Sequence, residues 1–288
     1  MRIFCFGLGY SALHFLDVQE SVEASGTVRA ADKARALRGD GVEAFVFDGA
    51  RADAGIASRL AQAEAVLASV APGAQDPVLA RFAEAIAANR RLRAIVYLST
   101  IGVYGDHGGA WVDEMSQTSP SSARGRARLV AEAQWRALGA SMGVPVHILR
   151  LAGIYGPGRN LLIKLREGEA RRIIKPGQTF NRAHVEDIAQ AISLVLAESA
   201  PGGIWNVADE EPAPPQDVIA FAAGLLGMAP PPEEPFETAD MTPMARSFYA
   251  DNKRVSIQKL KQELGFSQKY PTYREGLRAL AAAGEGRD

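Results

Sequence analysis

Three small residues near the start of the chain have the spacing of a phosphate-binding turn. Gly7, Gly9 and Ala12 form the pattern G-x-G-x-x-A directly after an apolar run at residues 3–6. The first glycine permits a tight turn, the second lets backbone approach a pyrophosphate, and the alanine lets helix pack closely on strand. The pattern predicts a dinucleotide seat, with an ordinary strand-to-helix turn as the alternative. We assign to this seat Gly7, Gly9, Tyr10, Ser11 and Ala12.

Short apolar runs alternate with amphipathic segments over the first half of the chain. After the opening strand and its helix, we expect strands at residues 26–29, 43–47, 65–70, 92–98 and 144–150. The expected helices are 32–40, with Asp32 as its cap, 52–62, 76–89 and 122–142. This alternation predicts the α/β class, with a parallel sheet covered by helices on both faces. Right-handed crossovers make such a sheet doubly wound.

Past Gly153 the alternation of predicted strands and helices becomes less regular. Helices are expected at residues 185–197, 216–226, 256–264 and 272–283, and loops at PAPP (212–215) and APPPEEP (229–235), because proline does not extend a helix. We therefore predict a dinucleotide-binding core at residues 1–152, to which part of 183–208 returns. Residues 153–288 are expected to form mainly a smaller substrate lobe.

Composition narrows the range of partners. Lysine and arginine total 32 against 33 acidic residues, which indicates neither nucleic acid nor an anionic membrane as a partner. Cys5 is the only cysteine, so the chain forms no internal disulfide, which favours a reducing compartment. Glycines interrupt the apolar amino terminus, and no run has the length to span a bilayer. We expect a cytoplasmic protein that acts on a small molecule, and we assign no metal site.

Basic residues follow the second predicted strand. An acid at this position accepts hydrogen bonds from the adenosine ribose, whereas a base accommodates a 2′-phosphate. Arg29 stands there, with Lys33 nearby, which favours NADP over NAD. The alternative assigns Lys33 to a solvated helix face. Asp48, after the third strand, is placed to approach the adenine or to form a turn before Gly49.

A series of longer motifs follows the glycine turn. They are YLSTIGVYG (97–105), the acidic pair at 113–114, SPSSARGRARLVAE (119–132), ILRLAGIYGPGRN (148–160) and NRAHVEDIAQAI (181–192). In this order the series resembles the extended short-chain dehydrogenase/reductases, also called the NAD-dependent epimerase/dehydratase family. The resemblance implies a Rossmann core, a nicotinamide cofactor and a substrate cleft roofed by the carboxyl-terminal lobe.

The same resemblance implies hydride transfer with a Ser or Thr, a Tyr and a Lys in the site. Thr100 matches the hydroxyl position, but Arg124 and Arg128 stand where the family has Tyr and Lys. A guanidinium stays protonated to a pH of about 12, so Arg124 does not exchange protons at neutral pH. We expect Arg128 to donate to the nicotinamide ribose and Arg124 to hold a carboxylate or phosphate. The alternative is a solvated basic helix face.

Other motif residues receive expected roles in the cleft. Tyr104 is the first candidate for a replacement proton donor, with packing as the alternative. Tyr155, Arg159 and Arg182 are assigned to the substrate, the arginines through its anionic groups. Pro72, just past the fourth strand, is expected to shape a loop against the cofactor or to end the strand.

We therefore expect an NADP-dependent oxidoreductase or epimerase that acts on a small anionic or sugar-like substrate. A non-catalytic NADP-binding sensor is the alternative, and a conventional nucleotide-sugar epimerase is disfavoured by the missing tyrosine. Trp135, Leu138 and Met142 form an apolar stripe on the long helix, which indicates core or a subunit contact. A homodimer is accordingly possible.

Overall fold

The computed structural model describes residues 1–19, 21–197 and 200–287. Its strands are β1 (Arg2–Phe6), β2 (Glu23–Val28), β3 (Glu43–Val46), β4 (Ala65–Ala68), β5 (Ala94–Thr100), β6 (Trp111–Val112), β7 (Val146–Leu151), β8 (Gly153–Tyr155), β9 (Arg172–Ile174), β10 (Arg182–His184), β11 (Gly203–Val207), β12 (Glu233–Pro235) and β13 (Arg254–Val255). Its helices are α1 (Tyr10–Asp17), α2 (Ala31–Gly39), α3 (Gly55–Leu60), α4 (Pro77–Ala88), α5 (Ala123–Met142), α6 (Leu161–Arg166), α7 (Val185–Val195), α8 (Pro215–Leu225), α9 (Pro243–Ser247), α10 (Gln258–Leu264) and α11 (Tyr273–Ala282), with a short 3₁₀ turn, η1 (Ile101–Val103).

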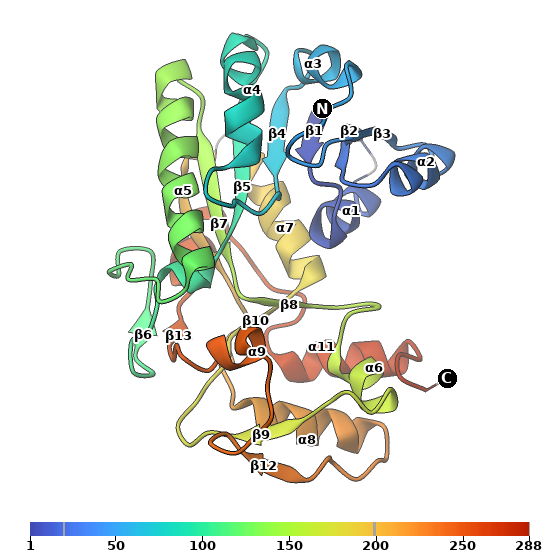
Figure 1. The fold of residues 1–288 in the computed structure, drawn as a ribbon, viewed down its shortest axis with the longest axis vertical. Helices are drawn as coiled ribbons and strands as arrows, with labels where there is room; N and C mark the ends of the chain where they lie inside the picture. Colours follow the sequence, from blue (N-terminus) through green and yellow to red (C-terminus); the bar gives the residue numbers. More distant parts are fainter. Residues whose placement is uncertain (20, 198–199, 288) are drawn as a thin grey trace. The chain divides into compact units, whose positions relative to one another are not determined.

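Seven strands form the main sheet in the order β11-β7-β5-β4-β1-β2-β3 (Figure 1). The inner strand β1 pairs in parallel with β2 on one side and β4 on the other, so that Cys5 lies opposite both Gly26 and Leu67. The chain thus reverses its direction of winding beside β1, and ligands of such sheets bind at this switch point. The predicted doubly wound α/β fold is confirmed.

The chain divides into two compact units, each built from separated segments. Unit 1 comprises residues 1–100, 123–150 and 188–205, and unit 2 comprises 101–122, 151–187 and 206–288. Residues 101–122 therefore group with unit 2, whereas the sequence-based boundary at 152 kept them with the core. Among the described helices, none combines the length and apolarity that a bilayer crossing requires.

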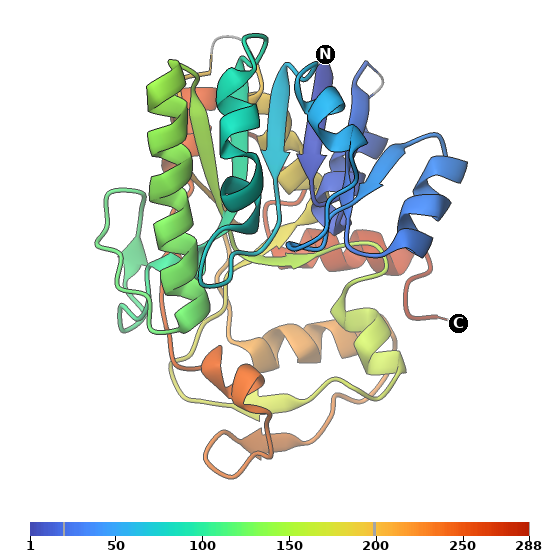
Figure 2. The same cartoon turned by 45° about the horizontal axis from the view of Figure 1, so that its top comes forward.

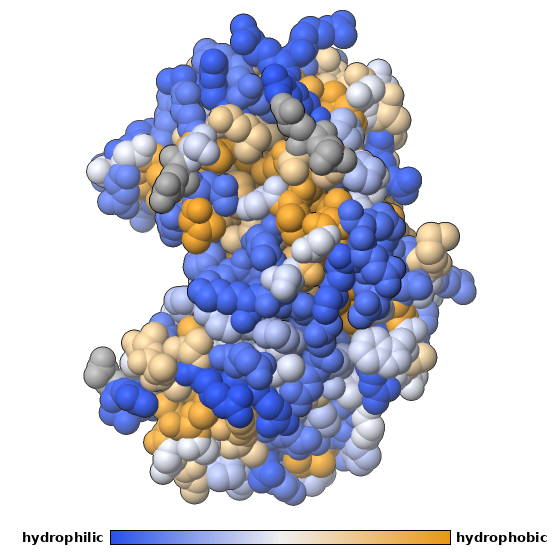
Figure 3. Space-filling view, turned by 180° about the vertical axis from the view of Figure 1, so that it is seen from behind, coloured by the Kyte–Doolittle hydropathy of each residue, from blue (hydrophilic) through white to orange (hydrophobic). Residues whose placement is uncertain are grey.

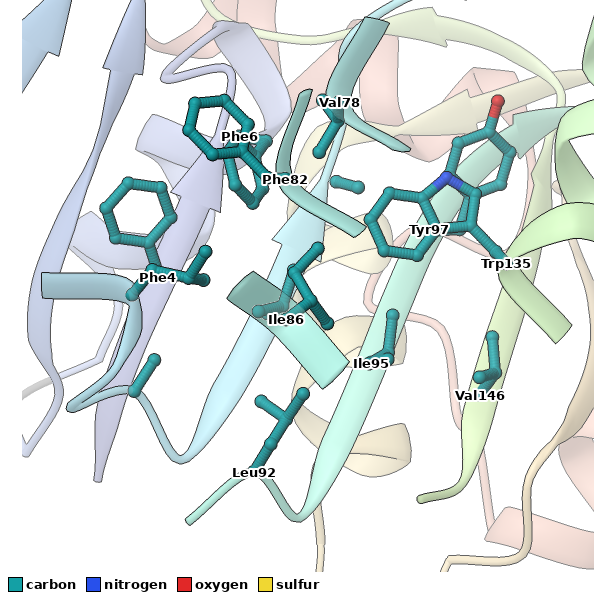
Figure 4. Close-up of a cluster of buried hydrophobic side chains, with 14 of the residues drawn as sticks. Phe4, Phe6, Val78, Phe82, Ile86, Leu92, Ile95, Tyr97, Trp135 and Val146 are labelled. Carbon is teal, nitrogen blue, oxygen red and sulfur yellow. The ribbon is translucent and has the colours of Figure 1, made fainter. Parts of the chain in front are cut away.

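The core of unit 1 lies between the sheet and the helices α3, α4 and α5 (Figure 4). Phe6 of β1 packs against Phe4 and against Phe82 of α4, with ring centroids 4.9 and 5.2 Å apart. Tyr97 of β5 stacks on Trp135 of α5 at 6.0 Å. Figures 1 and 2 show α4 and α5 side by side over the same face of the sheet. The buried rings therefore fix these two helices on β1 and β5.

The opposite face of the sheet is covered as well. Ile3 and Cys5 alternate with the phenylalanines of β1 and are also buried. The Gln19 amide just after α1 donates to the Ser193 hydroxyl of α7 at 2.9 Å, so these two helices lie together. Burial on both faces explains why the strands of a parallel sheet read as continuous apolar runs.

Helix α5 presents one side to the sheet at intervals of three to four residues. Glu132 forms a buried ion pair with Arg150 of β7 at 2.8 Å and accepts a hydrogen bond from the Ser99 hydroxyl at 2.5 Å. Trp135 donates through its indole nitrogen to Asp76, the N-cap of α4, at 3.0 Å. Leu138 and Met142 pack against the same core, which confirms the core interpretation of this stripe.

Several local predictions need correction. Helix α2 begins at Ala31, and its N-cap residue is Ala30, so Asp32 does not cap the helix. Asp32 lies in the first turn, where its negative charge interacts favourably with the helix dipole. The last residue of the predicted PAPP loop, Pro215, is the first residue of α8. Proline is tolerated there because the first helical N–H has no partner within the helix. The APPPEEP segment contains the short strand β12, and both the edge strand β11 and helix α6 were not predicted.

Unit 2 has its own apolar core, in which α6, α8 and α11 meet around Tyr273 and Leu277. Asp209 lies in this unit with an exposed fraction of 2%, and its two carboxylate oxygens have no hydrogen-bond partner among the described residues. Burial raises the pKa of the Asp209 carboxyl to about 8, although the Arg182 cation opposes the rise. Ionisation of this buried carboxyl is thus a cost that unit 2 bears at alkaline pH.

We expect Glu132→Ala to lower the free energy of unfolding by about 3–5 kcal/mol, because the buried Arg150 guanidinium would lose this carboxylate. Urea denaturation measures the change, with the exposed Gln134→Ala on the same helix as the control. The double variant Glu132→Leu with Arg150→Met should recover most of the loss. A loss below about 1 kcal/mol for Glu132→Ala would contradict a structural role for this pair.

We expect Asp209→Asn to stabilise the protein by about 1–3 kcal/mol at pH 8.5 and by less at pH 5. A carboxyl with a folded pKa of about 8 and an ordinary value of 3.8 loses its stabilising contribution as the pH rises between these values. Thermal unfolding at both pH values measures the difference, with the exposed Asp217→Asn as control. An equal effect of Asp209→Asn at the two pH values would show that its ionisation is not perturbed.

Candidate functional site

The turn after β1 leaves no room for a side chain at its first glycine. Gly7 has a φ of 97°, and its N–H donates to the Thr27 hydroxyl at 3.0 Å. The Ser69 hydroxyl of the segment after β4 donates to the Gly7 carbonyl at 2.7 Å. A Cβ added at Gly7 would lie 2.5 Å from the Ser69 oxygen. The turn is therefore held from both neighbouring strands, and only glycine satisfies its conformation.

The second glycine has the opposite surroundings. Gly9 is the N-cap of α1, no side chain caps this helix end, and a Cβ built on Gly9 meets no atom within 4 Å. Its φ of −96° is accessible to any residue, so backbone strain does not explain glycine here. Ala12 and Ser11 are buried in the following turn. An open, uncapped helix start fits a pyrophosphate, and the residues present fit a dinucleotide cofactor.

The basic residues expected at the adenosine end lie on the surface of unit 1. Arg29 directly follows β2, and Lys33 lies in the first turn of α2, whose amino end no side chain caps. Both side chains are exposed. Two exposed cations and an uncapped helix start thus follow the second strand, and their role toward a 2′-phosphate remains a prediction.

Asp48 forms the turn that the sequence offered as one alternative. One of its carboxylate oxygens accepts hydrogen bonds from the N–H groups of Ala50 and Arg51 at 2.9 and 2.7 Å. These bonds hold the pKa of the Asp48 carboxyl below its usual range. Asp48 therefore stays charged, and its approach to an adenine remains a prediction. Pro72 is half-buried in the segment after β4, and its contact with a cofactor also remains a prediction.

Arg128 is fixed against the carboxyl-terminal part of β5. One guanidinium nitrogen donates to the Tyr97 hydroxyl at 3.0 Å and to the Leu98 carbonyl at 2.7 Å. The guanidinium carbon also lies 5.4 Å from the centre of the Tyr97 ring. Burial raises the pKa of the Tyr97 phenol to about 12, so the pair holds one positive charge. Arg128 is thus a preorganised cation and not a solvated side chain.

Arg124 lies one helical turn before Arg128 and therefore shares its side of α5. Four residues correspond to about 6 Å along the helix axis. Because Arg128 bonds residues near the end of β5, Arg124 extends toward the carboxyl edge of the sheet, where Thr100 ends the strand. Arg124 is exposed and Thr100 is half-buried. The first turns of α5 thus carry one fixed cation, Arg128, and one solvent-accessible cation, Arg124.

Tyr104 occupies the interior of unit 2. Its exposed fraction is 0%, and its hydroxyl donates to the Asn206 side chain at 2.7 Å. The Asn206 amide in turn donates to the Ser256 carbonyl at 3.0 Å, and its backbone N–H donates to the Glu114 carboxylate. In this arrangement Tyr104 links three segments of the chain, as the packing alternative predicts.

The three predicted substrate residues all belong to unit 2 but differ in exposure. Tyr155 is 8% exposed, and its phenol lies where a Cβ on Gly276 would touch it at 2.1 Å. Arg182 donates to the carbonyls of Phe180 and Ala213, at 3.0 and 3.4 Å. Burial lowers the pKa of the Arg182 guanidinium. Arg159 alone is exposed. The substrate roles of these residues remain predictions.

Two residues important to this site were not assigned from the sequence. Tyr97 holds Arg128, and Glu132 holds the helix that carries both arginines. The signal for Glu132 is the spacing Arg128, Glu132, Trp135, which is one side of a helix, whereas Tyr97 on β5 has no such signal. In the described part of the chain, His, Cys, Asp and Glu side chains form no group of three or more that suits a metal ion.

Comparison of the sequence and the fold with known proteins identifies the family of this chain. The model of the NAD dependent epimerase/dehydratase family matches residues 35–208. Protein YeeZ from Escherichia coli K12 is 30% identical over 195 residues, which are 63% of this chain and 60% of that relative. The matched region is thus less than two thirds of YeeZ.

Solved structures show the same fold. A conserved protein of unknown function from Silicibacter pomeroyi is 48% identical, with a TM-score of 0.89 and 99% of each chain covered. UDP-glucuronic acid 4-epimerase from Bacillus cereus, solved with UDP-glucuronic acid and NAD, is 20% identical, with a TM-score of 0.79 and 98% of each chain covered. The family model, which covers more than half of the sequence, makes this chain a member of the NAD dependent epimerase/dehydratase family.

Proposed function

We propose that the protein is an NADP-binding oxidoreductase or epimerase that acts on a small anionic or sugar-like substrate. The observation that carries the proposal is the pair of glycines after β1. Gly7 is enclosed by Thr27 and Ser69, whereas Gly9 opens to free space at an uncapped helix start. A purely structural turn has no need for the second feature. A pyrophosphate, by contrast, needs close approach to backbone N–H groups.

The preference for NADP is supported by the cations after β2. Arg29 and Lys33 are exposed beside the free amino end of α2, and the only acid in the first turn of this helix is Asp32. A guanidinium matches a phosphate in charge and with two parallel hydrogen bonds, whereas a neutral ribose hydroxyl accepts a hydrogen bond without the charge attraction. The proposal therefore assigns the 2′-phosphate to Arg29 and Lys33.

A nicotinamide cofactor supplies a hydride acceptor or donor when it is bound. The residues of this chain then orient the cofactor and substrate and supply positive charge to the site. Arg128, held by Tyr97 and Leu98, places a permanent cation beside the end of β5, which suits hydroxyl groups of the nicotinamide ribose. Thr100 offers a hydroxyl to a substrate carbonyl or alcohol. Arg124 offers an exposed guanidinium to a substrate carboxylate or phosphate.

Proton transfer belongs to neither arginine, because a guanidinium does not lose its proton at neutral pH. In this conformation the Tyr104 hydroxyl is bonded to Asn206, so its use as a donor requires that this bond opens. These facts favour a second candidate function, an NADP-binding sensor without turnover. Incubation of bound NADPH with carbonyl compounds, followed at the nicotinamide absorbance, separates an enzyme from a sensor.

We expect Gly9→Val to weaken cofactor binding strongly with only a small loss of stability. The added methyl groups would fill the space in front of α1, while the φ of −96° accommodates valine. Calorimetry should show that NADPH and NADH both bind at least about tenfold more weakly, roughly 1.4 kcal/mol, while the melting temperature falls far less than in Gly7→Val.

Gly7→Val is the matched control for this experiment. It should lower the melting temperature, because its side chain would collide with Ser69 at a left-handed position. If Gly9→Val binds NADPH as tightly as the unmodified protein, the proposed seat is wrong.

We expect the unmodified protein to bind NADPH more tightly than NADH, and Arg29→Ala to remove most of this difference. Loss of one phosphate contact should weaken NADPH binding by about tenfold and leave NADH binding nearly unchanged. Arg35→Ala, another exposed arginine on α2, is the control. Tighter binding of NADH than NADPH by the unmodified protein would overturn the assignment.

A further inference from the structure

A second concave site lies at the opposite end of the strands of unit 1. Its cavity volume is about 270 Å³, and its lining includes Arg2, Glu64, Arg90, Arg91 and Arg93. Arg2 begins β1, whereas the glycine turn follows the end of this five-residue strand. At about 3.3 Å per residue the two sites are roughly 16 Å apart. This cavity is therefore separate from the proposed cofactor seat.

The backbone around the cavity is fixed by a chain of hydrogen bonds. The Arg93 N–H donates to the Glu64 carbonyl, and the Glu64 N–H donates to the Arg2 carbonyl, both at 2.8 Å. The buried Asn89 side chain donates to the carbonyls of Leu60 and Ala63 at 2.9 and 2.8 Å. The segment that carries the arginines is thus tied to the neighbouring loop, and a ligand would not have to order it.

Asn89 also positions the arginines directly. Its side-chain oxygen accepts a hydrogen bond from the Arg91 N–H at 2.9 Å. The next residue, Leu92, is 6% exposed and belongs to the core shown in Figure 4, so the backbone on both sides of Arg91 is anchored. The flanking arginines consequently extend outward from a rigid base.

The charge of this cavity is not balanced. Four guanidinium groups face one lining carboxylate, that of Glu64, which accepts the Arg2 N–H at 2.7 Å. Arg2 has a long contact of 3.8 Å with Glu23, and both side chains are largely exposed. The side chains of Arg90 and Arg91 have no hydrogen-bond or ion-pair partner in the described segments of the chain. Hydrophilic residues cover the top of the view in Figure 3, the end where β1 begins in Figure 1.

The geometry points to a second ligand site, one that binds a multiply charged phosphate compound at Arg2, Arg90, Arg91 and Arg93. Guanidinium groups bind phosphate oxygens in pairs, and several of them on a rigid backbone suit a chain of phosphates better than a single carboxylate. The volume is large enough for a triphosphate group. This inference is independent of the proposed function, because none of these residues belongs to the cofactor seat.

The test uses inorganic tripolyphosphate and the full chain in calorimetry at about 50 mM salt, where exposed charges are only partly screened. The unmodified protein should bind it at one site. The double variant Arg90→Ala with Arg91→Ala should bind at least about tenfold more weakly. The control Arg81→Ala with Arg136→Ala removes the same charge from exposed positions of α4 and α5 and should bind within about twofold of the unmodified protein.

Three outcomes would overturn the inference. These are no binding of tripolyphosphate at millimolar concentration, equal weakening by the two double variants, and complete displacement of tripolyphosphate by saturating NADPH. The first excludes a site, the second shows only general charge attraction, and the third places the anion at the cofactor seat. Equal melting temperatures of the two double variants confirm that both are folded. ATP in place of tripolyphosphate then distinguishes a nucleotide ligand from a free polyphosphate.

Discussion

The close contact of the first turn with both neighbouring strands is the constraint on which the rest of unit 1 depends. Gly7 lies between Thr27 and Ser69, with no space for a Cβ atom. This contact fixes where β1 ends and α1 begins. The helix start is consequently aimed at open space in front of Gly9, at the point where the strand order reverses. The fold thus places an uncapped positive helix end where an anion is expected.

The long helix α5 is the second determinant of the site. Glu132 and Trp135 fix it on the sheet through a buried ion pair and a hydrogen bond to Asp76. Arg128 and Arg124 occur earlier on the same side, so the anchors also determine where the two cations lie. The rigid scaffold therefore presents two arginines at the positions where the resemblance implied a Tyr and a Lys. The scaffold retains orientation and positive charge but has no proton-exchanging group at these positions.

The sequence predicted what local patterns encode. The glycine spacing, the alternation of strands and helices and the apolar stripe at Trp135 specified the core of unit 1, because each repeats at the period of its element. It did not predict β11, β12 or α6, which are short and depend on partners distant in the chain. The pair of Glu132 and Arg150 was also missed, since only tertiary structure shows which charges are buried. For the same reason the bond between Tyr104 and Asn206 could not be predicted from the sequence.

The most direct test of the central claim is a crystal structure of the protein grown with NADP⁺. Our account predicts that the pyrophosphate lies within hydrogen-bond distance of the backbone N–H groups at the start of α1, beside Gly9. It also predicts the 2′-phosphate next to Arg29. A dinucleotide bound elsewhere, for instance among the arginines at the amino end of β1, would contradict the account. So would the absence of bound cofactor at millimolar NADP⁺.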